Sequence, residues 1–216
     1  RLPYVPTYYF RPDIPEVSYT RDAFGLPDEG HLYVCPQTLF KFHPQFDTTL
    51  GELLRRDRDG YLILIDDQRG GSWRKLLYER FNRSFPEVVD RVTFVPHMPR
   101  EKYLGLLTIA DVILDIPTFS GGNSSLEALA MGAPVITWPQ DYMRGRVTAA
   151  LYKQMGMNEL IVTDEETYLA LALRLAQDLD FKKRMQADIR ANVAKLYERH
   201  EVVREMEKFF IAAYEA

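Results

Sequence analysis

The sequence is poor in cysteine and has no long apolar run. Cys35 is the only cysteine among 216 residues, so no disulfide can form within the chain, and we expect a reducing compartment, the cytoplasm. No run approaches the ~20 apolar residues that span a bilayer, so we expect no membrane span. Residues 1–10 also lack the apolar stretch of a secretory signal. The first residue is Arg rather than Met, which fits an excised fragment.

Positive charge is not in surplus either. The formal net charge is −4, whereas a nucleic-acid or membrane-surface binder is normally basic, so we expect no nucleic-acid partner. His31, His43 and His200 show no metal-ligand spacing to one another. No Ser-His-Asp, paired-cysteine or phosphate-loop lysine signature is present. We therefore expect a site that needs no metal and no cofactor.

What remains is the composition of an ordinary globular protein. The chain is 46% hydrophobic and 27% charged, and it is long enough for one substantial α/β domain. Residues 1–28 are dense in proline and tyrosine and show no sustained period, so we expect an extended linker that wraps onto the domain. The domain itself is expected over residues 29–216.

Five short apolar runs alternate with segments of helical period. The runs are HLYVC (31–35), YLILI (61–65), RVTFV (91–95), DVILD (111–115) and APVIT (133–137). The helical segments begin near Thr48, Ser72, Arg100, Asn123 and Arg146. Continuous apolar strands separated by helices indicate a parallel sheet covered on both faces. The predicted fold is α/β, a Rossmann-like doubly wound parallel sheet.

The C-terminal part, from about residue 164, has only helical patterns. Asp164 is placed to cap a helix over residues 165–178, and two more helices are expected over 181–197 and 200–214. The sheet should therefore carry a tail of C-terminal helices.

A glycine-rich turn is the strongest local signal for a site. Gly121-Gly122-Asn123-Ser124-Ser125 follows the fourth apolar run and opens a helix. Doubly wound sheets bind ligands at the carboxyl ends of their strands. The glycines allow close approach of a ligand, and free N–H groups at the positive end of the helix dipole suit a diphosphate. The hydroxyls of Ser124 and Ser125 can add donors to the same ligand. The same residues are also typical of an ordinary turn and N-cap.

Charged residues near this turn fit a nucleotide. Glu127 lies one turn into the helix, where its carboxylate could accept both hydroxyls of a ribose, although a first-turn glutamate also favours the helix dipole. Lys41 follows the first apolar run, and its ammonium could reach a diphosphate. The commoner fate of a single lysine is to be solvated.

The third apolar run is followed by a candidate base site. Backbone groups around His97, Met98 and Arg100 could read a base edge, while Tyr103 offers a stacking face or simply packs a half-buried helix.

Two further pairs of charged residues have open roles. Arg144 and Arg146 could clamp phosphates or an acidic acceptor, or pair with Asp141 and nearby glutamates. Asp66 and Asp67 end the second run and are interpreted as a turn and helix cap before Ser72.

Five ordered blocks of sequence resemble one family. They are VPHMPRE (95–101), ADVILDIP (110–117), SGGNSSLEAL (120–129), GAPVIT (132–137) and RGRVT (144–148). In this order they resemble the C-terminal lobe of the O-linked N-acetylglucosamine transferase and SPINDLY-like glycosyltransferases, which have the two-lobed GT-B fold. The resemblance covers most of residues 32–180, and five blocks are more specific than one glycine turn.

The resemblance implies a role for each candidate. Lys41, Asn123 and Ser124 would contact the diphosphate of a nucleotide sugar. Glu127 would hold the ribose. The loop and helix with Met98, Arg100 and Tyr103 would hold uracil.

The family implies metal-independent transfer from a nucleotide sugar, UDP-GlcNAc-like, to a protein acceptor. The chain departs from the family at three positions: Thr38 replaces Gln, and Gly122 and Tyr103 each replace His. These departures leave the sugar and the base open.

The acceptor base comes largely from an N-terminal catalytic lobe in this family. We therefore expect the isolated chain to bind and activate the donor but to be inactive in transfer. Two alternatives remain open from the residues: the lobe of a sugar-nucleotide epimerase, and a non-catalytic nucleotide-binding module.

Overall fold

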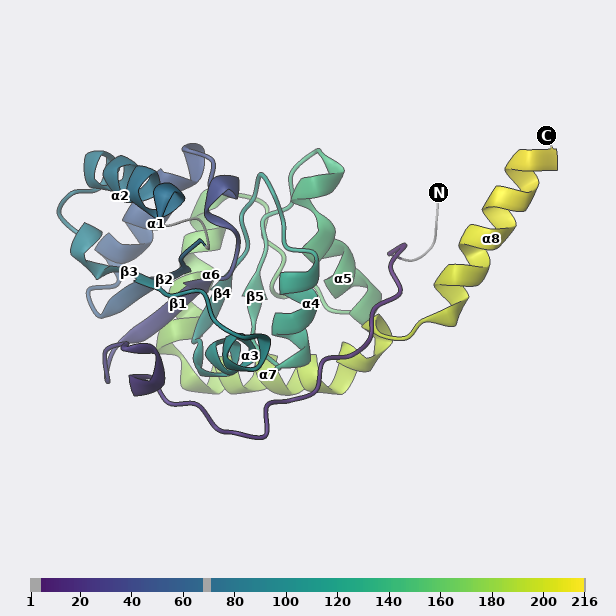
Figure 1. Ribbon diagram of the computed structural model, residues 1–216, viewed down its shortest axis with the longest axis horizontal. Coiled ribbons are helices and arrows are strands. Elements are labelled where there is room, and N and C mark those ends of the chain that lie inside the picture. Colours follow the sequence, from purple (N-terminus) through teal and green to yellow (C-terminus); the bar gives the residue numbers. More distant parts are fainter. Residues whose placement is uncertain (1–4, 68–70, 216) are drawn as a thin grey trace.

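The computed structural model describes residues 5–67 and 71–215 and contains a five-stranded parallel sheet (Figure 1). The strands lie in the order β3-β2-β1-β4-β5. They are β1 (His31–Cys35), β2 (Gly60–Ile65), β3 (Val92–Val95), β4 (Val112–Leu114) and β5 (Val135–Ile136). Each of the five apolar runs forms one strand, so the doubly wound parallel sheet is confirmed.

The central strands are buried on both faces, which explains their continuous apolar sequence. In β1, Val34 pairs with Ile63 of β2 on one side and with Ile113 of β4 on the other. None of these three side chains is more than 2% exposed. Parallel strands covered on both sides require such runs of Val, Ile and Leu.

Five helices connect the strands or follow them. They are α1 (Gln45–Arg56), α2 (Ser72–Ser84), α3 (Arg100–Ile109), α4 (Asn123–Ala130) and α5 (Val147–Met155). The predicted starts of α2, α3 and α4 are confirmed. Helix α1 begins three residues before Thr48 because Pro44, favoured in a first turn, precedes it. Helix α5 begins one residue after Arg146 because Met143–Gly145 forms a 3-10 turn.

Right-handed crossovers place α1 and α2 on one face of the sheet and α3 and α4 on the other. Helix α6 (Glu165–Gln177) packs beside α1 and against β1, β4 and β5. Its predicted cap is confirmed: Asp164 accepts a hydrogen bond from the backbone N–H of Thr167 at 2.8 Å, and the two residues form a capping box.

The last two helices differ from their predicted bounds. Helix α7 (Leu179–Asn192) starts two residues early because Asp178 caps it, accepting from the N–H of Phe181 at 2.9 Å. It ends at Asn192, where a 3-10 turn, Val193–Leu196, follows. Helix α8 (His200–Glu215) projects from the domain (Figure 1). No helix in the described part of the chain is long and apolar enough to cross a bilayer.

The N-terminal segment is extended, apart from a 3-10 turn at Asp22–Phe24. Phe24 and Leu26 are buried in the core, and the N–H of Val5 donates to the side chain of Gln154 at 3.1 Å. The part of the predicted linker that precedes residue 5 lies outside the described residues.

Candidate functional site

The site lies where the strand order reverses, between β1 and β4. At such a switch point the loops that follow the two strands diverge and leave a crevice at the carboxyl edge of the sheet. Two polar contacts bridge it. Gln37, after β1, donates from Nε2 to Oγ of Ser124 in α4 at 2.9 Å. Lys41 donates from Nζ to Oε1 of Gln37 at 3.1 Å. The structure thus brings Lys41 to the start of α4, with Gln37 between them.

The Lys41 ammonium lies in a partly apolar setting, 4.4 Å from the centroid of the Phe119 ring. Loss of solvent lowers the pKa of Lys41, and the negative charge of Asp115 opposes this shift. A partly desolvated cation interacts more strongly with an anion than a solvated one does.

The buried carboxylate of Asp115 fixes the loop between β4 and α4. Asp115 accepts hydrogen bonds of 2.7 Å each from the hydroxyls of Ser120 and Thr137 and from the N–H of Gly121. Burial raises the pKa of the Asp115 carboxyl, while these donors oppose the shift. The loop is therefore anchored from inside the domain.

Two predicted ligand contacts are corrected by this arrangement. The Ser125 hydroxyl is buried, at 2.7 Å from the hydroxyl of Thr148, so it holds the loop and does not face a ligand. The N–H of Gly121 is bound to Asp115 and cannot donate to a diphosphate. The two glycines also differ in what they allow. A Cβ on Gly121 would lie 2.1 Å from Oγ of Ser125, whereas one on Gly122 would meet nothing within 4 Å. Gly121 is required by packing, and Gly122 leaves open space.

The start of α4 carries N–H groups without a side-chain cap, since its N-cap residue is Gly122. The first N–H groups of a helix have no partner within the helix and form the positive end of its dipole. Asn123 is exposed and Ser124 is half-buried, so this end of α4 faces the crevice.

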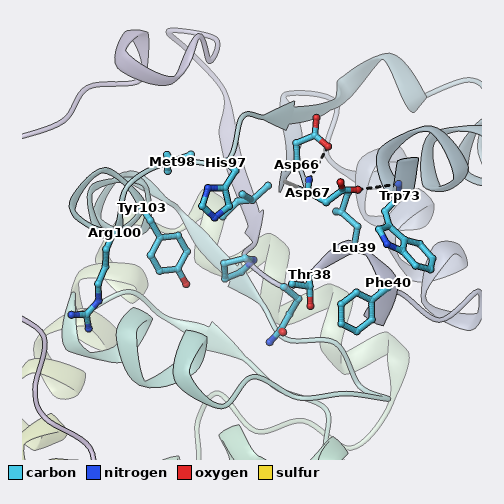
Figure 2. A pocket seen from close by; sticks show the side chains of 13 residues that line it. Thr38, Leu39, Phe40, Asp66, Asp67, Trp73, His97, Met98, Arg100 and Tyr103 are labelled. Atoms are coloured by element: carbon cyan, nitrogen blue, oxygen red, sulfur yellow. Dashed lines mark hydrogen bonds between the residues drawn. The ribbon is translucent and has the colours of Figure 1, made fainter. Parts of the chain in front are cut away.

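A pocket of about 580 Å³ opens beside these residues (Figure 2). Its size is in the range of small-molecule sites. The predicted base-binding residues Met98, Arg100 and Tyr103 line one end, together with His97. The structure therefore brings the residues after β3 to the same cavity as the loop after β1.

The opposite end of the pocket is aromatic and acidic. The rings of Phe40 and Trp73 lie with their centroids 6.0 Å apart. Asp67 accepts a hydrogen bond from the N–H of Trp73 at 2.9 Å, and Asp66 accepts one from the N–H of Asp67 at 2.8 Å. Asp67 thus binds an N–H of the first turn of α2, but the N-cap residue is Gly71, which makes no side-chain cap, and residues 68–70 of the predicted turn lie outside the described residues.

Glu127, in α4, contacts a residue that lines the pocket. Its Oε1 lies 3.3 Å from Nε of Arg100, at the end of the pocket where the base is predicted. The Tyr9 hydroxyl donates to the same oxygen at 3.3 Å. The Glu127 side chain is 14% exposed, so its carboxylate is largely withdrawn from water but still accessible.

Arg144 contacts the loop before α4 through its backbone, since its carbonyl oxygen accepts a hydrogen bond from the N–H of Ser120 at 2.7 Å. The Arg144 guanidinium stacks over the Tyr142 ring, 4.6 Å from its centroid. Arg146 is exposed, and over residues 5–67 and 71–215 it does not line the pocket. Neither arginine forms an ion pair with Asp141 or another carboxylate of the described chain.

Three residues of the site escaped sequence reasoning. Gln37, Asp115 and Tyr9 act through contacts that span 87, 22 and 118 positions of the chain. Gln37 lies two residues after β1 and Asp115 one residue after β4, at the carboxyl edge of the sheet, which is the signal that could have singled them out. Tyr9 carries no comparable signal.

Comparison with known proteins identifies related chains. The model of glycosyl transferase family 41 matches residues 13–206. A relative from Arabidopsis thaliana, described as the probable UDP-N-acetylglucosamine–peptide N-acetylglucosaminyltransferase SEC, is 27% identical over 179 residues. The match covers 82% of this chain and 18% of the relative. The UDP-N-acetylglucosamine–peptide N-acetylglucosaminyltransferase of Caenorhabditis elegans is 28% identical over 79% of this chain and 14% of its own length.

The fold is also that of a solved structure, an O-GlcNAc transferase of Thermobaculum terrenum. The two superpose with a TM-score of 0.75 at 24% identity, over 97% of this chain and 38% of the other. This chain therefore spans less than a fifth of the length of the two sequence relatives and well under half of the structural one.

Proposed function

Because this chain belongs to glycosyl transferase family 41, we propose that it is the donor-binding, C-terminal lobe of a two-lobed, GT-B glycosyltransferase. The donor is a nucleotide sugar of the UDP-GlcNAc type, and the acceptor is a protein. Both sequence relatives are named for this donor and for a peptide acceptor, which supports the proposal.

One observation carries the assignment: the hydrogen-bonded link from Lys41 through Gln37 to Ser124. Glycosyl transfer builds negative charge on the departing diphosphate. That charge is stabilised by fixed donors that need no reorganisation during the reaction. The ammonium of Lys41 and the uncapped N–H groups of α4 are two such donors on opposite sides of one crevice. We propose that they take the place of a metal ion at the diphosphate.

The rest of the nucleotide fits the neighbouring residues. The pocket at Met98 and Tyr103 accommodates the base, and Glu127 lies between this pocket and the phosphate-binding end of α4. The ribose, which joins base to phosphate, is thus placed against the Glu127 carboxylate. Arg146 is exposed and is not among the residues that line the described pocket, and we assign it to the acceptor side.

The acceptor and its general base are assigned to the remaining polypeptide of such enzymes, which accounts for most of the length of the relatives. The chain then binds the donor without transferring the sugar by itself. Family membership favours a transferase over a sugar-nucleotide epimerase. A cytoplasmic location agrees with the buried, unpaired Cys35.

The test is a ligand screen by thermal unfolding of the 216-residue chain in EDTA. A ligand that binds only the folded state raises the unfolding temperature, and at one ligand concentration the shift is larger for the ligand that binds more tightly. UDP and UDP-GlcNAc are expected to raise it more than GDP and ADP do. An equal effect of inorganic pyrophosphate would reduce the site to a general anion site, and the absence of any shift would overturn the proposal.

A further inference from the structure

The N-terminal segment reaches the proposed ribose site through one side chain. Residues 5–20, which we name the N-terminal strap, run along the lower edge of the domain to the side where α8 begins (Figure 1, purple). Within the strap, the Tyr9 hydroxyl donates a hydrogen bond to Oε1 of Glu127 at 3.3 Å. This contact joins the beginning of the chain to a residue 118 positions later.

Both the backbone and the ring of Tyr9 contact the segment that precedes α8. Its carbonyl oxygen accepts a hydrogen bond from the N–H of Glu198 at 2.9 Å, and its ring lies 6.5 Å from the ring of Tyr197. The hydroxyl of Tyr197 donates to the carbonyl of Leu126, the residue next to Glu127, at 2.5 Å. The backbone and the ring of Tyr9 are therefore fixed relative to the helix that carries Glu127.

Further contacts fasten the strap at its two ends. The N–H of Val5 donates to Gln154 at 3.1 Å. At the other end, the Tyr19 ring packs so closely on α3 that a Cβ on Gly105 would lie 2.2 Å from it. Because the strap is attached to α5 at one end and to α3 at the other, the fold itself fixes the position of Tyr9.

The Glu127 carboxylate is occupied on one oxygen only. Tyr9 and Arg100 both contact Oε1, each at 3.3 Å. Over residues 5–67 and 71–215 no protein group donates to Oε2. Because a carboxylate is planar, two donors on one oxygen set the direction in which the other oxygen points.

We propose that Tyr9 is a positioning residue for ribose recognition: by holding Oε1 of Glu127, it directs Oε2 towards the ribose hydroxyls of the nucleotide. This inference rests on the proposed function. It makes the strap part of the donor site, although none of its residues needs to touch the nucleotide.

The chemistry of Tyr9 suits this role. Burial, and then the negative charge of Glu127, raise the pKa of Tyr9 above its ordinary value of 10.0. The hydroxyl therefore keeps its proton at neutral pH and remains a donor. The other donor to Oε1, Arg100, has a side chain that is 61% exposed, so it is less constrained than Tyr9.

The test compares Tyr9→Phe with Tyr8→Phe, a matched control on the same strap. Tyr8 packs its ring 5.2 Å from His200 and makes no contact with Glu127. Calorimetry would measure the affinities of both variants and the parent chain for UDP and GDP and for their 2′-deoxy forms. Because Tyr9 positions Glu127 and does not itself bind the nucleotide, Tyr9→Phe should weaken ribonucleotide binding by about three- to tenfold, less than the loss of Glu127 itself. The 2′-deoxy nucleotide should show a clearly smaller loss, and Tyr8→Phe none.

The outcomes separate this inference from the function on which it rests. Parent-like ribonucleotide binding by Tyr9→Phe, in a chain that does bind nucleotide, would overturn the role of Tyr9 alone. An equal loss for ribose and deoxyribose forms would also overturn it, because the strap would then act only on the fold. If the parent chain bound no nucleoside diphosphate, the proposed function itself would fall, and the inference with it.

Discussion

Gln37 and Ser124 lie 87 positions apart in the chain, and a hydrogen bond of 2.9 Å between their side chains joins the loop after β1 to the start of α4. Gln37 is 5% exposed and also accepts from Lys41. One buried amide therefore sets the separation between the lysine and the N-terminal end of α4, which we propose hold the diphosphate from two sides.

Replacement of Gln37 by Ala should weaken nucleoside diphosphate binding by about 5- to 30-fold, since it removes a buried partner of both Ser124 and Lys41. The control is Thr108→Ala, at an exposed residue whose hydroxyl donates to the carbonyl of Gly105 within α3 at 2.7 Å. Calorimetric titration of both variants with UDP checks the prediction. Equal affinities of the two variants would show that the bridge does not organise the site.

The affinity for nucleotide should fall at alkaline pH because of Lys41. Desolvation lowers the pKa of this lysine, so its ammonium loses its proton at a lower pH than the ordinary 10.5. A bound diphosphate favours the charged form, and binding therefore weakens as pH rises through the lowered pKa.

The matched variant is Lys41→Arg, which stays charged over this range. The ratio of its UDP affinity to that of the parent should rise with pH, whereas titration of the ligand itself affects both chains alike. A constant ratio would mean that the Lys41 charge does not act on the nucleotide.

Glu127→Ala should reduce affinity for a ribonucleotide about tenfold or more, the loss expected for a hydrogen bond to a charged acceptor. The unfolding midpoint should change little, because the partner Arg100 is 61% exposed and such pairs contribute about 0–1 kcal/mol. Affinity and thermal unfolding are measured on the same preparation. Unchanged affinity with a lower midpoint would make Glu127 a helix-dipole partner instead.

The buried Asp115 predicts an unusual dependence of stability on pH. Burial raises the pKa of its carboxyl above 3.8, so the folded state binds this proton more tightly than the unfolded state. Its contribution to the free energy of unfolding is largest at low pH and declines as pH rises through the raised pKa.

Asp115→Asn removes this dependence, since the amide does not ionise. The parent chain should therefore gain stability relative to the variant as pH falls from about 8 towards about 4. Urea unfolding of both chains measures the difference. A difference that is constant with pH, or a parent chain that loses stability relative to the variant on acidification, would contradict the raised pKa.

The sheet could be predicted from the sequence because the sequence signals for strands are local. The apolar run 61–65, rich in Ile and Leu, is a buried strand by composition alone, and Asp164 with Thr167 forms a cap within four residues. Helix bounds were less predictable where a neighbouring turn competed, as at Met143–Gly145 before α5.

The site was predictable only in part, for a related reason. The glycine-rich turn, Glu127 and Lys41 stand in recognisable local patterns. The contacts that orient these residues have no local pattern in the sequence. Gln37 contacts Ser124 only when β1 and β4 pair, and Tyr9 contacts Glu127 only when the strap wraps around the domain. Ser125 was misassigned because a sequence does not show that its hydroxyl points inward to Thr148.

The most direct test of the account is calorimetric titration of the 216-residue chain with UDP, once in EDTA and once in Mg²⁺. In the proposed site, Lys41 and the start of α4 hold the charge of the diphosphate. We therefore predict saturable binding of one nucleotide per chain, with the same affinity in both buffers and a marked loss in Lys41→Ala. Binding that disappears in EDTA, or no saturable binding in either buffer, would contradict it.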